Sequence, residues 1–281
     1  MFSMMNEARI GVGFLATAIG YAGYLQSVEY AKTRVQGRPV DAKDPAAKPV
    51  AIIEHPDVKR MLLAQKSYVE GALALCLWSS LLVDRVAATG DEDERARAAL
   101  LLDVITPISK SWPSQWCLTA NDLAIQVHGG YGYTKEFDVE QCYRDNRLNP
   151  IHEGTHGVQA IDLLGRKFTM KGGTGLRVLV ETITETIDRA PAAGGAAAGY
   201  AAALRAALER TPAAVLPAWA DAAPAVALAN ATAFLEATGH TVLAWLWLEQ
   251  FLAADGKEGD FYDGKRAATR YFFTYELPKT G

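Results

Sequence analysis

One acidic residue stands in a setting that suits proton transfer. Glu153 is followed by Gly154 and Thr155 and comes shortly after Pro150. Pro150 opens a segment expected to enter a helix, so these residues lie at the helix's amino end. Free backbone N–H groups and the helix dipole there face an anion or a developing oxyanion. Glycine leaves room for a substrate, and burial raises the pKa of a glutamate, so proton abstraction is the indicated chemistry. The simpler alternative is a carboxylate that only stabilises the helix end.

The same residues also match a metal-binding pattern. His152 to His156 reads H-E-x-x-H, and Asp162 is a possible third ligand for zinc. However, Pro150 places His152 at the helix entrance, where a zinc peptidase needs both histidines within the helix. Gly154 also weakens the helix between them. No metal is therefore expected, and a zinc peptidase is the remote alternative.

A glycine-rich loop and a polar cluster precede Glu153. Gly129-Gly130-Tyr131-Gly132-Tyr133 lets backbone approach a ligand closely, because glycine has no Cβ. Tyr143-Arg144-Asp145 is expected to tie down a helix end. Together with Glu153, these features concentrate the candidate chemistry between Gln126 and Gln159.

The elements that must position these residues are predicted to be helices. Gly37 to Pro56 contains four prolines and is expected to form a loop. Apolar spacing and Gly or Pro boundaries predict helices at Met5–Arg34, Val58–Thr89, Asp93–Val127 (bent at Pro107 and Pro113), Val139–Asp145, and from near Glu153 to Lys167. Met5–Arg34 carries a small-residue face that allows a close approach of another helix.

A second set of helices follows a glycine-rich break at Lys171–Gly175. Ala190–Gly199 is rich in Ala and Gly and is expected to be a linker with little fixed structure. Helices are predicted at Leu176–Asp188, Tyr200–Glu209, Pro217–Ala254 and Lys265–Tyr275. Because no useful β-alternation occurs, the predicted fold is all-α. It comprises an antiparallel bundle of long helices over residues 1–168 and a further helical domain over residues 169–281.

Composition narrows the function classes. The 281 residues are 50% hydrophobic and 21% charged, with a net charge of -4 and no clustered basic run, which disfavours nucleic-acid binding. Three widely spaced cysteines favour a reducing compartment, and we expect a cytoplasmic protein. The apolar run Ile10–Leu25 is shorter than the roughly 20 residues of a membrane span. It is interpreted as a helix buried on most sides, and no membrane association is expected.

The segment QVHGGYGYTKEFDVEQCYRDNRLNPIHEGTHGVQAIDLLGRK resembles the signature of acyl-CoA dehydrogenases. The shared order is Gln-x-x-Gly-Gly-x-Gly-Tyr, Tyr-Arg-Asp, Glu-Gly-Thr and a nearby Gln. Residues 5–9 and 30–38 open and close the first long helix as in that family. The resemblance covers roughly residues 1–168. The tail, with Trp245, Trp247 and Phe272-Phe273, more weakly resembles the extra helical domain of a large-subunit branch that includes methylthio-propanoyl-CoA dehydrogenases.

The resemblance implies a flavin-dependent oxidation of acyl-CoA to 2,3-enoyl-CoA. Glu153 would remove the proton α to the thioester, and the β-hydrogen would leave as hydride to FAD. The backbone N–H of Glu153, with a ribityl hydroxyl, would polarise the thioester carbonyl. Gly154 would line the acyl pocket, and Asn6 and Arg9 would contact CoA. The FAD contacts would come from Thr155 and Gly157, and, toward a neighbouring subunit's FAD, from Arg34, Gln36, Gln126, Gly129 and Gly130.

The resemblance also implies partners. A homo-oligomer, dimer or tetramer, and an electron-transferring flavoprotein as electron acceptor are expected. The 281 residues correspond to the third domain of the family onward, without its N-terminal helical domain and middle β-domain. The chain is therefore expected to keep the base, while FAD binding by this chain alone is left open. A non-catalytic helical protein kept for oligomerisation is the second hypothesis.

Two departures from the family pattern affect particular roles. His152 replaces the tyrosine most common before the glutamate, which changes the shape of the acyl pocket. The loop after Arg34 is one residue shorter than the usual form, which weakens the assignment of Gln36.

Overall fold

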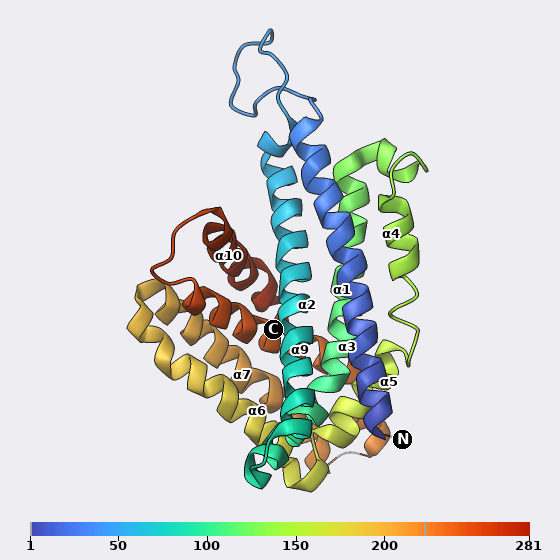
Figure 1. Cartoon of the computed structure of the whole chain (residues 1–281), viewed down its shortest axis with the longest axis vertical. Coiled ribbons are helices and arrows are strands. Elements are labelled where there is room, and N and C mark those ends of the chain that lie inside the picture. The colour runs from blue at the N-terminus through green and yellow to red at the C-terminus, as the bar shows by residue number, and fades with distance from the viewer. Residues whose placement is uncertain (1, 222) are drawn as a thin grey trace.

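Two sets of helices pack side by side in the computed structural model, which describes residues 2–221 and 223–281 (Figure 1). The first set is built on three long helices, α1 (Phe2–Thr33), α2 (Pro56–Ala88) and α3 (Glu92–His128). The shorter helices α4 (Val139–Asn146) and α5 (His156–Ile161) lie along their side. The predicted antiparallel bundle is confirmed, and no strand occurs among the residues described.

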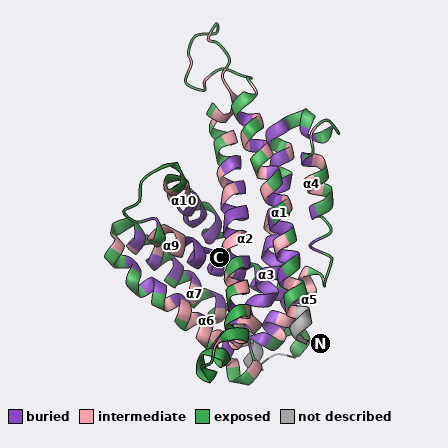
Figure 2. Ribbon diagram, viewed as in Figure 1, coloured by how far each residue is buried: buried purple, intermediate pink, exposed green. Residues whose placement is uncertain are grey.

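Small residues on α1 allow it to approach α3 closely, as its sequence predicts. A Cβ added to Gly13 would lie 2.1 Å from the backbone oxygen of Ser109, and one on Gly20 would lie 2.7 Å from Cys117 Cβ. One stripe of α1 nevertheless stays exposed, including Leu15 and Leu25. The helix is thus buried on most sides and open along one (Figure 2).

The helix α3 is continuous through both of its prolines. Pro107 and Pro113 lie inside Glu92–His128, where bends were predicted. The helix begins at Asp91, whose carboxylate accepts hydrogen bonds from the backbone N–H groups of Asp93 and Glu94. Packing on both sides by α1 and α2 holds the helix together where two backbone hydrogen bonds are missing.

The second set contains α6 (Met170–Arg189), α7 (Gly195–Asp221), α8 (Pro224–Ala227), α9 (Ala231–Ala253) and α10 (Asp260–Tyr271). The break predicted at Lys171–Gly175 is present, because Lys171, Gly172 and Gly173 have positive φ angles. After α10 the chain continues through a π turn, η5 (Phe272–Glu276), and a 3-10 turn, η6 (Leu277–Thr280).

Two predictions in this half were wrong. Ala190–Gly199 is not a loose linker, since a 3-10 turn, η4 (Ala190–Ala193), leads directly into α7. Ala190 and Ala197 are fully buried, so helical packing of alanine outweighs the flexibility of the neighbouring glycines. Pro217–Ala254 is not one helix either. Part of this range, residue 222, lies outside the described residues. Within the described residues, the chain turns between α8 and α9, so the helices there are separate.

A continuous apolar core joins the two sets of helices. Residues of α2 and α3, among them Leu75 and Ile108, belong to the same buried cluster as Leu243 and Trp247 of α9. The indole N–H of Trp247 donates to Ser67 O over 3.1 Å. The helix α2 is long and apolar enough to cross a membrane by length and composition alone, a criterion that core helices also meet. Here α2 packs against α3, α9 and α10.

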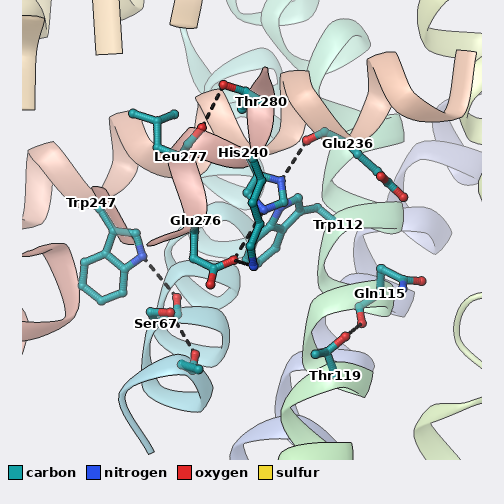
Figure 3. A network of polar contacts seen from close by, with 12 residues as sticks. Ser67, Trp112, Gln115, Thr119, Glu236, His240, Trp247, Glu276, Leu277 and Thr280 are labelled. Carbon is teal, nitrogen blue, oxygen red and sulfur yellow. Dashed lines mark hydrogen bonds and ion pairs between the residues drawn. The ribbon is translucent and has the colours of Figure 1, made fainter. Parts of the chain in front are cut away.

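A buried polar network reinforces this junction (Figure 3). The Glu276 carboxylate lies 2.6 Å from Lys279 Nζ and 3.8 Å from His240 Nε2. Burial alone would raise the pKa of Glu276, but the nearby polar groups of His240, Lys279 and Tyr68 hold it below its usual value. The last turn of the chain is thereby tied both to α9 and to α2.

Candidate active site

Glu153 lies on a strained turn at the amino end of α5. Its φ angle is 53° and that of Gly154 is 92°, so two consecutive residues occupy left-handed backbone conformations. A positive φ costs a non-glycine residue free energy and persists only where surrounding contacts enforce it. The predicted position of Glu153 before a helix is confirmed, since α5 begins at His156.

Buried side chains from two helices hold this turn through its carbonyl groups. Gln159 Nε2 of α5 donates to Glu153 O over 3.0 Å. Lys110 Nζ of α3 donates to Gly154 O over 2.6 Å and to Asn149 O over 2.8 Å. A Cβ on Gly154 would lie 2.9 Å from Gln159 Nε2, so a larger residue would disturb the turn.

The Glu153 carboxylate itself points to the surface. Its side chain is 41% exposed, and its Oε1 lies 3.8 Å from Nε2 of the exposed His152. Thr155 and Gly157, the predicted flavin contacts, follow within four residues of it. This chain therefore positions the carboxylate but does not supply the burial that the sequence analysis expected.

His156 is held as a neutral imidazole inside the protein. Its Nε2 donates to Gln115 Oε1 over 2.9 Å, and its Nδ1 accepts from the hydroxyl of Ser111. Burial and the positive charges of Lys110 and Arg147 lower its pKa to about 4. Because both ring nitrogens are already engaged, these contacts argue against a zinc site. Within the described part of the chain, no three metal-ligating side chains gather.

The predicted CoA contacts lie at the same end of the bundle as Glu153. Arg9 Nη1 is 2.8 Å from Asp162 Oδ2, and both side chains are mostly buried. Asp162 also pairs with Arg166 over 3.1 Å. Asn6 lies one helical turn before Arg9 on α1. The guanidinium of Arg9 is thus committed to an internal ion pair that fixes the start of α1 against η3 (Asp162–Lys167), and its contact with CoA stays a prediction.

A second group of predicted residues lines a hollow at the other end of the bundle. The hollow has a volume of about 300 Å³, and its lining includes Arg34, Gln36, Gln126 and Gly129. Arg34 Nε is buried without a hydrogen-bond partner in the protein. Gly129, which opens η2 (Gly129–Tyr133), and its neighbour Gly130 have open space where a Cβ would stand. A buried N–H donor beside accessible backbone fits the diphosphate of a dinucleotide.

The two groups of residues are far apart in one chain. Arg9 and Arg34 are separated by 25 residues of sequence along α1, which at 1.5 Å per residue is about 37 Å. In Figure 1, α5 and the long loop that follows α1 lie at opposite ends of the bundle. Within one chain, the residues of each group lie close together, but the two groups lie far from each other.

Lys110 is the functional candidate that the sequence analysis missed. It stands between Ser109 and Ser111 in an otherwise apolar run and is fully buried. A single lysine in a buried helix is the signal that could have drawn attention to it, because lysine is almost never fully buried without a partner. Its partners, two backbone carbonyls, lie 39 and 44 residues away, so the pattern itself could not reveal them.

Comparison with known proteins agrees with this fold. Residues 1–167 match the family model for the acyl-CoA dehydrogenase C-terminal domain, and residues 179–281 match a model described as acetyl-CoA dehydrogenase C-terminal like. The chain belongs to the acyl-CoA dehydrogenase family. It is 37% identical over 279 residues to 3-methylmercaptopropionyl-CoA dehydrogenase of Ruegeria pomeroyi, covering 97% of this chain and 47% of that protein.

Solved structures share the fold at low sequence identity. Caenorhabditis elegans ACDH-11, solved in complex with C11-CoA, has a TM-score of 0.81 at 19% identity, over 98% of this chain and 43% of that one. An acyl-CoA dehydrogenase from Bacillus anthracis, complexed with FAD, has a TM-score of 0.75 at 18% identity, over 99% and 48%. This chain therefore spans about half the length of the relatives and structures that it matches.

Proposed function

We propose that this chain is the part of an acyl-CoA dehydrogenase that carries the catalytic base. Glu153 removes the proton from the carbon α to the thioester, the β-hydrogen leaves as hydride, and a 2,3-enoyl-CoA forms. FAD, when bound, accepts that hydride. The observation that carries the proposal is the Glu153 turn, where a carboxylate is held in a left-handed conformation beside a glycine at the amino end of a helix.

The backbone around Glu153 supports a second role. The first N–H groups of a helix have no partner within it, so they can donate to a developing oxyanion. The N–H of Glu153 itself is the donor that the family resemblance assigns to the thioester carbonyl. Gly154 leaves space beside this carbonyl for the acyl chain.

The hollow at the far end of α1 supports FAD as the cofactor. The buried, unpartnered Nε of Arg34 would bind a diphosphate oxygen, and Gln36 and Gln126 would donate their amides nearby. Because this hollow is remote from Glu153, the two groups serve two FAD molecules. We therefore propose a homo-oligomer in which each FAD lies between subunits.

The electron acceptor and the location in the cell follow from the same proposal. We propose that an electron-transferring flavoprotein reoxidises the enzyme, and that the enzyme works in the cytoplasm. The three cysteines are all free thiols in the structure, which is consistent with a reducing compartment.

Replacing the base in the complete dehydrogenase tests this function. Glu153→Gln keeps the shape but cannot accept the proton, so acyl-CoA should no longer reduce the flavin while FAD stays bound. Anaerobic loss of the yellow flavin absorbance measures this. Glu136→Gln, at another exposed glutamate, is the control and should behave as wild type. Failure of the wild-type assembly to hold FAD would favour the alternative of a non-catalytic oligomerisation protein.

A further inference from the structure

A buried cation lies directly behind the Glu153 turn. Lys110 is 0% exposed, and the hydrogen-bond acceptors of its ammonium group are Asn149 O at 2.8 Å and Gly154 O at 2.6 Å. Both are neutral carbonyls, one at each end of the segment that carries Glu153. A buried lysine is ordinarily paired with a carboxylate, and this one is not.

Other lysines that are buried or half-buried show the contrast. Lys167 is also almost fully buried, but its Nζ lies 2.6 Å from the Asp103 carboxylate on α3. Lys66 and Lys265 share the carboxylate of Glu70. Among these lysines, Lys110 alone holds main-chain oxygens, and those oxygens belong to the proposed catalytic turn.

We propose that Lys110 is a positioning residue, whose ammonium group clamps the segment from Asn149 to Gly154 and so fixes the left-handed conformation that presents Glu153. The inference rests on the proposed function of Glu153. The geometry explains how a strained φ of 53° is maintained, because both carbonyls of the turn are held by side chains, Glu153 O by Gln159 and Gly154 O by Lys110.

Charges around the clamp agree with this role. Burial, and to a smaller extent the nearby Arg9, lower the pKa of Lys110 to about 8, while Glu153 opposes them. The facing ring of His156 is held neutral, so it adds no further positive charge near neutral pH. The negative charge of Glu153 thus favours the protonated, charged form of Lys110. The orientation of Glu153 is in this way coupled to the charge of Lys110.

The first test needs neither FAD nor substrate. In the wild-type chain uniformly labelled with 15N and 13C, the Lys110 ammonium should give a slowly exchanging signal with scalar coupling across the hydrogen bond to the Gly154 carbonyl carbon. In Lys110→Met, the carbon chemical shifts of Glu153 should move from values typical of a left-handed backbone toward values typical of a backbone with negative φ. In Lys167→Met, the matched control, the Glu153 shifts should stay unchanged.

The second test uses the complete dehydrogenase. Lys110→Met should slow flavin reduction by about 100-fold, the cost expected for a reacting group misplaced by about 1 Å. The Kd for acyl-CoA and the FAD content should be unchanged, and Lys110→Arg, which keeps a charged donor, should recover part of the rate. Lys167→Met should reduce flavin at the wild-type rate.

Several results would overturn the clamp. One is the absence of the coupling in the wild-type chain. Another is a folded Lys110→Met variant in which the Glu153 carbon shifts remain typical of a left-handed backbone. A third is a rate of flavin reduction by Lys110→Met equal to that of Lys167→Met. If Lys110→Met does not fold, two measurements remain. A missing coupling in the wild-type chain, or a flavin-reduction rate of Lys110→Arg equal to that of Lys167→Met, would then overturn the clamp. If the wild-type enzyme reduces no flavin, the proposed function fails, while the coupling still decides whether the clamp exists.

Discussion

At the scale of single residues, the site combines an exposed carboxylate with an unusually buried support. Glu153 lies at the surface, but behind it Lys110 and Gln159 are fully buried and His156 is half-buried. A rigid polar support beneath an exposed carboxylate suits the proposed function, in which Glu153 reaches a substrate bound outside the bundle. The precision of the site is thus set by residues that do not touch the substrate.

The neutral form of His156 makes a pH prediction. Its folded-state pKa is about 4, below the ordinary value of 6.5. Between these values the unfolded chain binds more protons than the folded chain, so stability falls as pH decreases from 6.5 toward 4. Allowing for partial solvent screening, we expect a loss of about 1–2 kcal/mol from this group.

Thermal unfolding measured against pH checks this effect. His156→Gln should be less stable at pH 7 and should have a flatter dependence between pH 6.5 and 4. His152→Gln changes an exposed histidine and is the control. An unchanged slope in His156→Gln would show that other groups cause the acid sensitivity.

At the scale of elements, α1 connects the two groups of site residues, and its packing against α3 sets where each group lies. Helical periodicity was sufficient to predict α1, α2 and α3, because long apolar patterns with clear Gly and Pro boundaries have few alternative structures. It also predicted that α3 would continue through Pro107 and Pro113, where neighbouring helices compensate for the lost hydrogen bonds. It failed for Ala190–Gly199, where burial of alanine decides the structure.

Two glycines on α1 provide a matched pair for testing the packing. Gly13→Ala would place a methyl group 2.1 Å from Ser109 O, so α1 and α3 must separate, at a cost of about 3 kcal/mol. Gly11→Ala meets no atom within 4 Å and should stabilise the helix by about 0.5–1 kcal/mol. Urea unfolding of both variants measures the difference. Equal stabilities would contradict the described approach of the helices.

At the scale of the whole molecule, the distance between the two groups of residues is the feature that the proposed homo-oligomer explains. The sequence pattern predicted which residues belong to the site through its resemblance to a family. It could not predict the clamp by Lys110 or the positive φ of Glu153, because neither depends on residues adjacent in sequence. The joint core of the two helical units likewise depends on contacts between distant segments, such as Trp247 with Ser67.

Mixing two inactive variants of the complete dehydrogenase tests the shared site. Glu153→Gln lacks the base, and Arg34→Met lacks the proposed FAD anchor. If each site takes Glu153 from one subunit and Arg34 from its neighbour, a heterodimer contains one intact site. Random mixing in a dimer should therefore restore roughly a quarter of the wild-type activity. No recovery in mixtures whose subunits demonstrably exchange would show that each site takes Glu153 and Arg34 from the same subunit.

The central claim, that Glu153 removes the α-proton, is tested most directly by following that proton. Acyl-CoA carrying tritium at C2 is incubated with the complete dehydrogenase, and tritium released to water is counted. We expect the wild-type enzyme to release it and Glu153→Gln to release almost none while retaining FAD and binding acyl-CoA normally. Release by Glu153→Gln at the wild-type rate would show that another group is the base.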